Sequence, residues 1–95
     1  MTLEELLTLA GKYVIDNDGD YWKLSQNPVI GQLGRIIYGL YGTKGRRKGK
    51  LYHLTMFGVE TPWITPKPQA MVDSHPNLTL TPIAYQDLPA GMIFD

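Results

Sequence analysis

Apolar side chains recur at helical spacing at the start of the chain. Thr2 and Glu5 match a capping box, in which the hydroxyl accepts a backbone N–H of the first turn and the carboxylate accepts the N–H of the cap residue. The apolar positions on one helix face are Leu3, Leu6, Leu7, Ala10 and Val14. The pattern predicts a helix over residues 2–10 and leaves open whether Gly11 ends it or whether it continues through residues 13–15.

Residues 16–20 read Asp-Asn-Asp-Gly-Asp, which is typical of a turn because these residues tolerate left-handed backbone and bond locally. We name this segment the acidic turn. Its aspartates copy the first ligand positions of a calcium-binding EF-hand loop, but Tyr21 replaces the required glycine and Asn27 the bidentate glutamate. We expect a turn without a metal, followed by a strand over residues 21–25.

Residues 28–42 carry conflicting signals. Asn27-Pro28 is typical of a helix start. The apolar positions that keep a helical period are Val29, Leu33, Ile36 and Leu40. However, Gly31, Gly34 and Gly39 would each cost about 1 kcal/mol in a helix, and residues 35–41 are rich in strand formers. We predict a helical turn near residues 28–33 and a strand over 34–42, with a single helix over 28–41 as the alternative.

A Gly-rich segment with many cations, the basic loop (residues 43–50), separates this strand from the next. Residues 50–57 alternate, with Leu54 and Met56 on one face and Thr55 and Phe57 on the other. A hairpin over 34–57 is therefore expected at the centre of the fold. Beyond it, six prolines exclude long helices and confine strands to edges, with residues 77–81 and 92–94 as the best candidates.

Composition places these elements in one small domain, residues 1–95. At 95 residues and 43% hydrophobic content, the chain can bury one modest core and is too apolar for disorder. We expect an α+β fold: an N-terminal helix packed on a small, mainly antiparallel sheet with a central hairpin and a proline-rich C-terminal segment. Because the sequence contains no cysteine, disulfides, thiolate nucleophiles and cysteine zinc sites are excluded.

Charge is balanced overall, with nine basic and nine acidic residues, but segregated along the chain. The candidate acidic face comprises Glu4, Glu5, Asp16, Asp18 and Asp20. The candidate basic site comprises Lys44, Arg46, Arg47, Lys48 and Lys50. Such a dipole can attract partners of either sign. The acidic start and the lack of a long apolar run lead us to expect a cytoplasmic or virion protein with no membrane partner.

Catalytic motifs are incomplete. Gly45 and Gly49 enclose too few residues for a phosphate-binding loop. Asp73-Ser74-His75 places the members of a hydrolase triad side by side, whereas a triad works by convergence of separate segments. His53, on a predicted strand, is expected to be partly buried and hydrogen-bonded. We expect no enzyme, no cofactor and no metal.

The basic loop is the leading candidate for binding. Its cations suit phosphates or acidic side chains, and neighbouring aromatic side chains could stack on unpaired bases. The candidate aromatic residues are Tyr38, Tyr41, Tyr52 and Trp63. The plain alternative is a solubilising hairpin tip that protects the sheet from edge pairing. Trp63 either contacts a partner or fills the domain's own core, and the apolar segment 92–94 must be covered by the sheet or by another chain, which leaves a homo-oligomer open.

The leading hypothesis is a non-catalytic module that acts by occupying a protein or nucleoprotein surface. Missing catalytic motifs, segregated charge and an apolar C-terminal segment motivate it. A small regulator or inhibitor encoded by a phage or mobile element would fit this size and composition. The alternative is nucleic-acid binding through the basic loop, residues 43–50.

Overall fold

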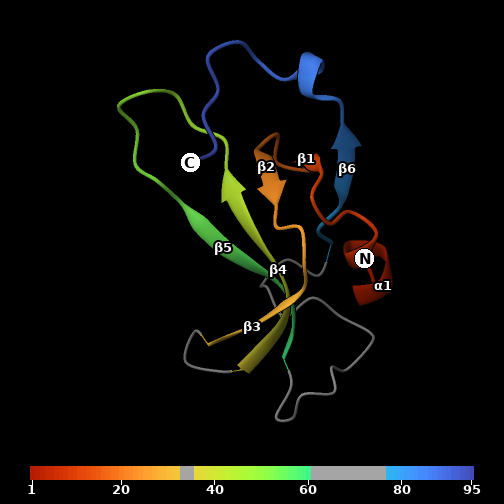
Figure 1. The fold of residues 1–95 in the computed structure, drawn as a ribbon. Coiled ribbons are helices and arrows are strands. Elements are labelled where there is room, and N and C mark those ends of the chain that lie inside the picture. The colour runs from red at the N-terminus through yellow and green to blue at the C-terminus, as the bar shows by residue number, and fades with distance from the viewer. Residues whose placement is uncertain (33–35, 61–76) are drawn as a thin grey trace.

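The computed structural model of the protein describes residues 1–32, 36–60 and 77–95. This part combines a short α-helix, a six-stranded antiparallel sheet and a 3₁₀ helix, which agrees with the expected α+β class (Figure 1). The elements are α1 (Leu3–Leu7), β1 (Tyr13–Asp16), β2 (Tyr21–Leu24), β3 (Val29–Gln32), β4 (Ile36–Lys44), β5 (Leu54–Glu60), β6 (Leu80–Ile83) and η1 (Tyr85–Asp87). The strand order is β3-β4-β2-β1-β6, and β5 pairs with β4.

Helix α1 begins with the predicted capping box. Thr2 Oγ1 accepts the Glu5 N–H at 3.2 Å, and Glu5 Oε1 accepts the Thr2 N–H at 3.0 Å. The helix ends at Leu7, earlier than predicted, because the chain then tightens into turns and reaches Gly11 in left-handed conformation, with φ 75°. The predicted apolar face is correct in part: Leu3 and Leu6 are buried, Leu7 and Ala10 are half-buried, and Val14 is buried on β1. The buried Leu9 was not predicted.

The acidic turn connects β1 and β2, as the sequence predicts. Asp16 organises it: Oδ1 accepts the backbone N–H groups of Asp18 at 2.8 Å and Asp20 at 2.9 Å. Its second oxygen, Oδ2, accepts the indole N–H of Trp22 at 2.9 Å. Gly19 supplies the left-handed residue of the turn, with φ 86°. The carboxylate of Asp16 is therefore a structural group that joins the turn to a core side chain.

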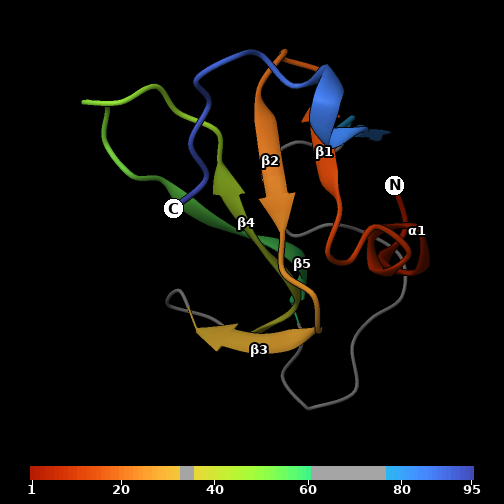
Figure 2. The same ribbon diagram turned by 45° about the horizontal axis from the view of Figure 1, so that its top comes forward.

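The middle of the chain forms strands and not a helix. Strand β2 bends at residues 25–28 and continues as β3, and both strands pair with β4 (Figure 2). The predicted helical turn at 28–33 and the alternative helix over 28–41 are therefore wrong. Ser25 secures the bend, because its N–H donates to the Tyr41 carbonyl at 2.8 Å and its Oγ accepts the Tyr41 N–H at 3.0 Å.

The predicted central hairpin over 34–57 is confirmed as the pairing of β4 with β5. Strand β5 starts at Leu54 instead of residue 50 and continues to Glu60. Gly39 lies opposite Gly58, and a Cβ added to Gly39 would fall 2.6 Å from the Cα of Gly58. Only glycine permits backbones to approach so closely, so this pair is required where β4 and β5 lie nearest each other.

Strand β6 pairs with β1 and contains Pro82, which a strand at a sheet edge tolerates. The strand predicted at 77–81 is thus found slightly later in the chain. The strand predicted at 92–94 is reduced to one bridge between Ile93 and Arg46. Residues 61–76, with Trp63, the Asp73-Ser74-His75 triplet and most of the proline-rich segment, lie outside the described residues.

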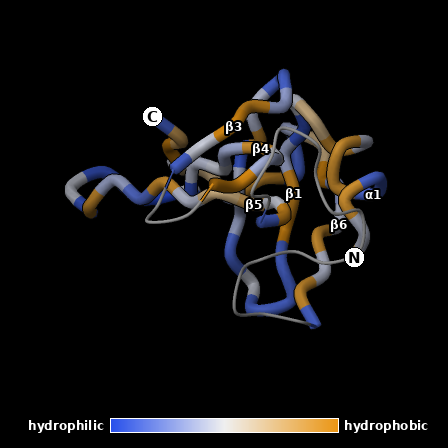
Figure 3. The backbone as a smooth tube through the Cα atoms, turned by 90° about the horizontal axis from the view of Figure 1, so that it is seen from below, coloured by the Kyte–Doolittle hydropathy of each residue, from blue (hydrophilic) through white to orange (hydrophobic). Residues whose placement is uncertain are grey.

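The core lies between α1 and one face of the sheet. Its members are Leu3, Leu6, Leu9, Val14, Trp22, Leu24, Leu40, Phe57, Val59, Leu78 and Leu80. The rings of Trp22 and Phe57 meet edge to face at its centre, 5.1 Å apart. In Figure 3 apolar colours follow α1 and the strands, whereas the chain between β4 and β5 extends away from the body. Neither helix in the described residues has the length and apolar character needed to cross a membrane.

Candidate binding surface around the basic loop

Residues 45–53, here named the β4–β5 connection, project from the molecule in all three views (Figures 1, 2 and 3). Lys44 N–H donates to the His53 carbonyl at 2.9 Å, which extends the strand ladder beyond β4 and β5. The tip turns where Lys50 N–H donates to the Arg47 carbonyl at 3.0 Å, and Gly49 there has φ 88°. The prediction of a strand from residue 50 is wrong because residues 50–53 lie outside the strand and are exposed.

Arg46 anchors the base of the connection. Its backbone pairs in both directions with Ile93, at 2.8 Å and 2.7 Å. Its guanidinium donates from Nη1 to the Lys50 carbonyl at 2.9 Å and from Nη2 to the Asp95 carbonyl at 2.5 Å. The candidate cation Arg46 therefore joins the connection to the C-terminal segment and acts as a positioning residue.

The C-terminal segment 92–95 is itself held by this chain. The ring of Phe94 packs edge-on against Tyr13, with centroids 5.0 Å apart. Met92 lies so close to Gly45 that a Cβ on the glycine would fall 2.5 Å from its sulfur. The apolar C-terminal segment thus packs against residues of the same domain, which is one of the two alternatives that the sequence left open.

The remaining candidate cations differ in what they contact. Within the described residues, the side chains of Arg47, Lys48 and Lys50 make no hydrogen bond or ion pair, and all three are exposed. Lys44 Nζ lies 3.5 Å from Asp20 Oδ2, in a pair whose side chains are 38% and 41% exposed. Such an exposed pair adds little stability. Three cations of the connection therefore remain directed to solvent.

Exposed apolar side chains accompany these cations. Leu51 is 91% exposed, Tyr52 55% and Leu54 48%. A hairpin tip that only confers solubility is expected to be mainly polar, whereas exposed apolar side chains that lie together are a feature of contact surfaces. The connection thus combines the two kinds of group that a macromolecular contact uses.

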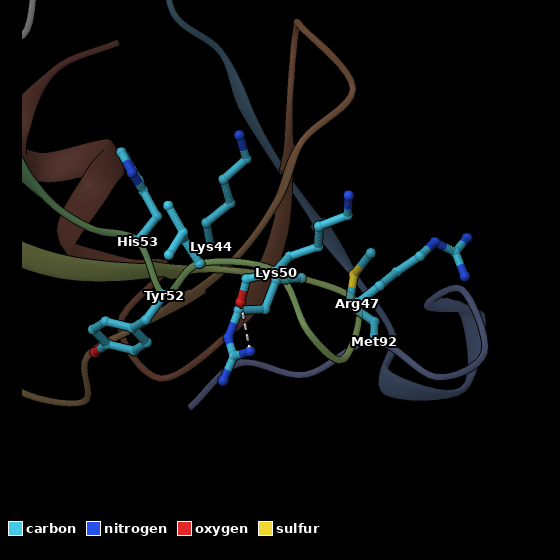
Figure 4. A pocket seen from close by; sticks show the side chains of 9 residues that line it. Lys44, Arg47, Lys50, Tyr52, His53 and Met92 are labelled. Atoms are coloured by element: carbon cyan, nitrogen blue, oxygen red, sulfur yellow. Dashed lines mark hydrogen bonds between the residues drawn. The ribbon is translucent and has the colours of Figure 1, made fainter.

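A hollow of about 480 Å³ opens at the base of the connection (Figure 4). Its basic lining residues are Lys44, Arg46, Arg47 and Lys50, and its apolar ones are Leu51, Tyr52 and Met92. His53 and Gly45 complete it, and none of the described lining residues is acidic. In Figure 4 Lys44 and Lys50 extend on the same side of the chain, Tyr52 on the other, and Arg47 reaches outward past Met92.

The other candidate aromatic residues do not join Tyr52 at this hollow. Tyr38 packs against the core. Tyr41 lies on the opposite face of β4, and its hydroxyl would sit 2.8 Å from a Cβ added to Gly31. The structure therefore separates the aromatic set that the sequence placed beside the basic loop, and Trp63 is not among the described residues.

The candidate acidic residues occupy two places. Glu4 and Glu5 lie on α1, which precedes the start of β1, while the acidic turn lies at the far end of β1 (Figures 1 and 2). A second hollow, of about 260 Å³, is lined by the three aspartates of the turn together with Lys44 and His53. In residues 1–32, 36–60 and 77–95, no three His, Asp or Glu side chains are placed to hold a metal ion.

His53 is exposed and lies outside β5, so its prediction as a partly buried strand residue is wrong. Its ring meets that of Trp22 at an angle of 61°, with centroids 5.8 Å apart. Sequence reasoning also missed Leu51, Leu54 and Met92 as parts of this surface. The alternation over residues 50–57 assigned the two leucines to a strand, and no local signal pairs Met92 with the connection.

No known protein family, curated protein or solved structure matches this chain.

Proposed function

We propose that the protein is a non-catalytic binding module that acts by occupying an acidic surface of a partner protein or nucleoprotein, with the β4–β5 connection as its contact. One observation carries the proposal: exposed cations and exposed apolar side chains stand together on one projecting segment. The cations are Arg47, Lys48 and Lys50, and the apolar residues are Leu51 and Tyr52, with exposed Leu54 next to them at the start of β5. A module of this kind regulates or inhibits its partner by covering it.

The two kinds of side chain have separate roles. The cations accelerate encounter with an acidic surface and favour the correct orientation. The apolar side chains supply affinity, because fully burying a leucine contributes about 1.5–3 kcal/mol. Tyr52 adds a rigid ring with a polar end, a combination common at interfaces.

Anchoring of the connection supports the same proposal. Arg46 ties its base to Ile93 and Asp95, and the ladder is extended by the bond from Lys44 to His53. A contact segment that is ordered before binding loses less conformational freedom when it docks. The base of the connection is thus prepared for binding, while its tip presents the contacting side chains.

Nucleic-acid binding is the second candidate function, and Tyr52 is the observation that favours it. The ring is exposed beside Lys50 and Arg47 at the hollow, where a base could stack while the cations neutralise phosphates. The separation of Tyr38 and Tyr41 from the connection leaves Tyr52 as the one candidate tyrosine there, so we place this function second.

Two triple variants test the proposal, one of charge (Arg47→Ala, Lys48→Ala, Lys50→Ala) and one of apolar contact (Leu51→Ser, Tyr52→Ser, Leu54→Ser). Lys12→Ala is the matched control, since Lys12 is exposed and lies outside the connection. A protein captured from an extract of the producing cells is purified, and its affinity for each variant is measured by calorimetry over a salt series. We expect each triple variant to weaken affinity at least about tenfold, and the charge variant to remove most of the salt dependence.

Equal affinity of the wild type and both triple variants for the purified partner would refute the proposal. Labelled single- and double-stranded DNA and RNA are titrated in parallel. A logarithmic salt slope of about −3 on duplex, as three phosphate contacts require, that disappears in the charge variant would make nucleic acid the ligand instead. No binding at low salt would remove the second candidate.

A further inference from the structure

The hollow beside the connection has a one-sided chemistry. Its lining brings together four cationic side chains and no described acidic one, so a ligand that enters it carries negative charge. Leu51, Tyr52 and Met92 form its apolar part. The volume of about 480 Å³ lies within the range of about 300–1,000 Å³ in which small ligands and side chains are bound. A folded acidic surface is too broad to enter such a hollow, whereas a linear segment fits.

The walls of the hollow are held by bonds that do not involve a ligand. Arg46 is fixed by its pairing with Ile93 and by the carbonyls of Lys50 and Asp95. Met92 is packed against Gly45, and the His53 ring is packed against Trp22. The part of the hollow formed by Arg46, Met92 and His53 is therefore in place before binding, which lowers the cost of docking a short segment.

We infer that this hollow receives a short acidic and apolar linear segment of the partner protein, which narrows the partner class of the proposed function and rests on it. A carboxylate of the segment meets the Lys50 ammonium, which has no side-chain partner among the described residues. Leucine or phenylalanine side chains on either side of this carboxylate pack against Met92 and, across the connection from Lys50, against Tyr52. Lys44 contributes less because it already faces Asp20. Leu51 and Met92 line the hollow beside the rings of Tyr52 and His53, and these aliphatic side chains favour a protein side chain over a stacked base.

The test is a titration of the full chain, ¹⁵N-labelled, with a short synthetic peptide in which Asp and Glu alternate with Leu and Phe. A second peptide has the same charges with serine at every apolar position, and a short single-stranded oligonucleotide is the third probe. We expect the first peptide to shift the amide signals of residues 44–53 and 92 and the indole signal of Trp22, whose ring contacts His53. The serine peptide should bind more weakly by about fivefold or more.

Variants locate the binding within the connection. Lys50→Gln and Tyr52→Ala are each expected to weaken binding of the first peptide by about fivefold or more. Lys48→Gln makes the same change of charge on the same connection but outside the lining residues, so it should weaken binding less than Lys50→Gln. Lys12→Gln, at a distant exposed lysine, is the control for net charge.

The outcomes separate this inference from the proposed function. Absence of shifts around the hollow, or equal effects of Lys48→Gln and Lys50→Gln, would overturn the inference. So would shifts caused by the oligonucleotide and not by the peptide. A further outcome is a purified partner that loses affinity for both triple variants and yet binds Lys50→Gln and Tyr52→Ala as tightly as the wild type. In that case the proposed function stands and the inference fails.

Discussion

Two charged segments connect antiparallel strands in this molecule, the acidic turn between β1 and β2 and the β4–β5 connection. In the acidic turn, Asp16 accepts three hydrogen bonds and Asp20 faces Lys44. In the connection, the Arg46 side chain is likewise hydrogen-bonded within the domain, whereas the side chains of Arg47, Lys48 and Lys50 are exposed to solvent. Exposed leucines accompany the connection, whereas residues 16–20 contain no apolar side chain.

This difference between the two segments shows that a high density of charge does not by itself identify a binding surface. What matters is whether the charged group is already bonded within its own fold. A carboxylate that accepts hydrogen bonds from its own fold contributes to the free energy of unfolding, and its removal leaves those donors without that acceptor. A solvated cation contributes little to stability and is available to a partner. The two segments should therefore respond in opposite ways to mutation.

The largest effect on stability is expected at Gly39, which lies opposite Gly58 in the β4–β5 hairpin. Gly39→Ala should lower the free energy of unfolding by about 3 kcal/mol, because the new Cβ would collide with the backbone of Phe57 and Gly58 and overpacking against backbone is not easily relieved. Urea denaturation followed by circular dichroism measures the change. Gly19→Ala is the contrast in the acidic turn: nothing lies within 4 Å of its Cβ, so only the left-handed φ penalises it, by about 1–2 kcal/mol. Equal losses would show that the close approach at Gly39 tolerates a methyl group.

Removal of the Asp16 carboxylate tests the inward role of the acidic turn. Asp16→Ala should destabilise the protein by about 2–3 kcal/mol, because two backbone N–H groups and the Trp22 indole lose their acceptor. Asp18→Ala is the matched control, since its side chain is exposed and only its backbone N–H is bonded to the turn. Equal unfolding midpoints for Asp16→Ala and Asp18→Ala would contradict the structural role of the Asp16 carboxylate.

Arg46 and Arg47 are adjacent arginines with opposite expected roles. Arg46→Ala should cost about 1–2 kcal/mol of stability and speed hydrogen exchange of the Ile93 amide, because the guanidinium bonds to Lys50 and Asp95 are lost. Arg47→Ala should change stability by less than about 0.5 kcal/mol. Native-state hydrogen exchange measured by NMR resolves the two. Faster exchange at Ile93 in the Arg47 variant would contradict the assignment.

The smallest effect is expected at the capping box. The backbone N–H and the hydroxyl of Thr2 lower the pKa of Glu5 below its usual value, by hydrogen bonds that favour the carboxylate. Because the pKa of Glu5 is lower in the folded state, its carboxylate stabilises the fold at pH values above the unfolded pKa of about 4.3. This stabilisation is lost as the pH falls through the folded-state pKa. Wild type should therefore exceed Glu5→Gln slightly in thermal midpoint at neutral pH, and the difference should vanish in acid. A difference that grows in acid would have the wrong sign for this linkage.

Sequence patterns located most local features and failed where pairing partners are distant. The capping box, the acidic turn and the central hairpin were all predicted. Residues 29–32 were misassigned to a helical turn, because Val29 and later apolar residues keep a helical period, whereas pairing of β3 with β4 makes them a strand. At the candidate site, the position of the basic loop on a hairpin was predictable, but the exposure of Leu51 and Leu54 was not. The pairing of β5 with β4 starts at Leu54, so Leu51 lies outside the strand in which the alternation had placed it.

The α+β class, the acidic turn and the concentration of cations in one connection could all be predicted from the order of residues. Capping, left-handed glycine and strand propensity act over a few neighbouring residues, so they are legible in the order of residues. Tertiary packing determines which of these cations are bonded within the domain and which are exposed to solvent. Arg46 is bonded to Asp95, 49 positions away along the chain, whereas Arg47 beside it is not. That division depends on how the C-terminal segment packs on the sheet, and a contact between distant segments leaves no periodic trace in either of them.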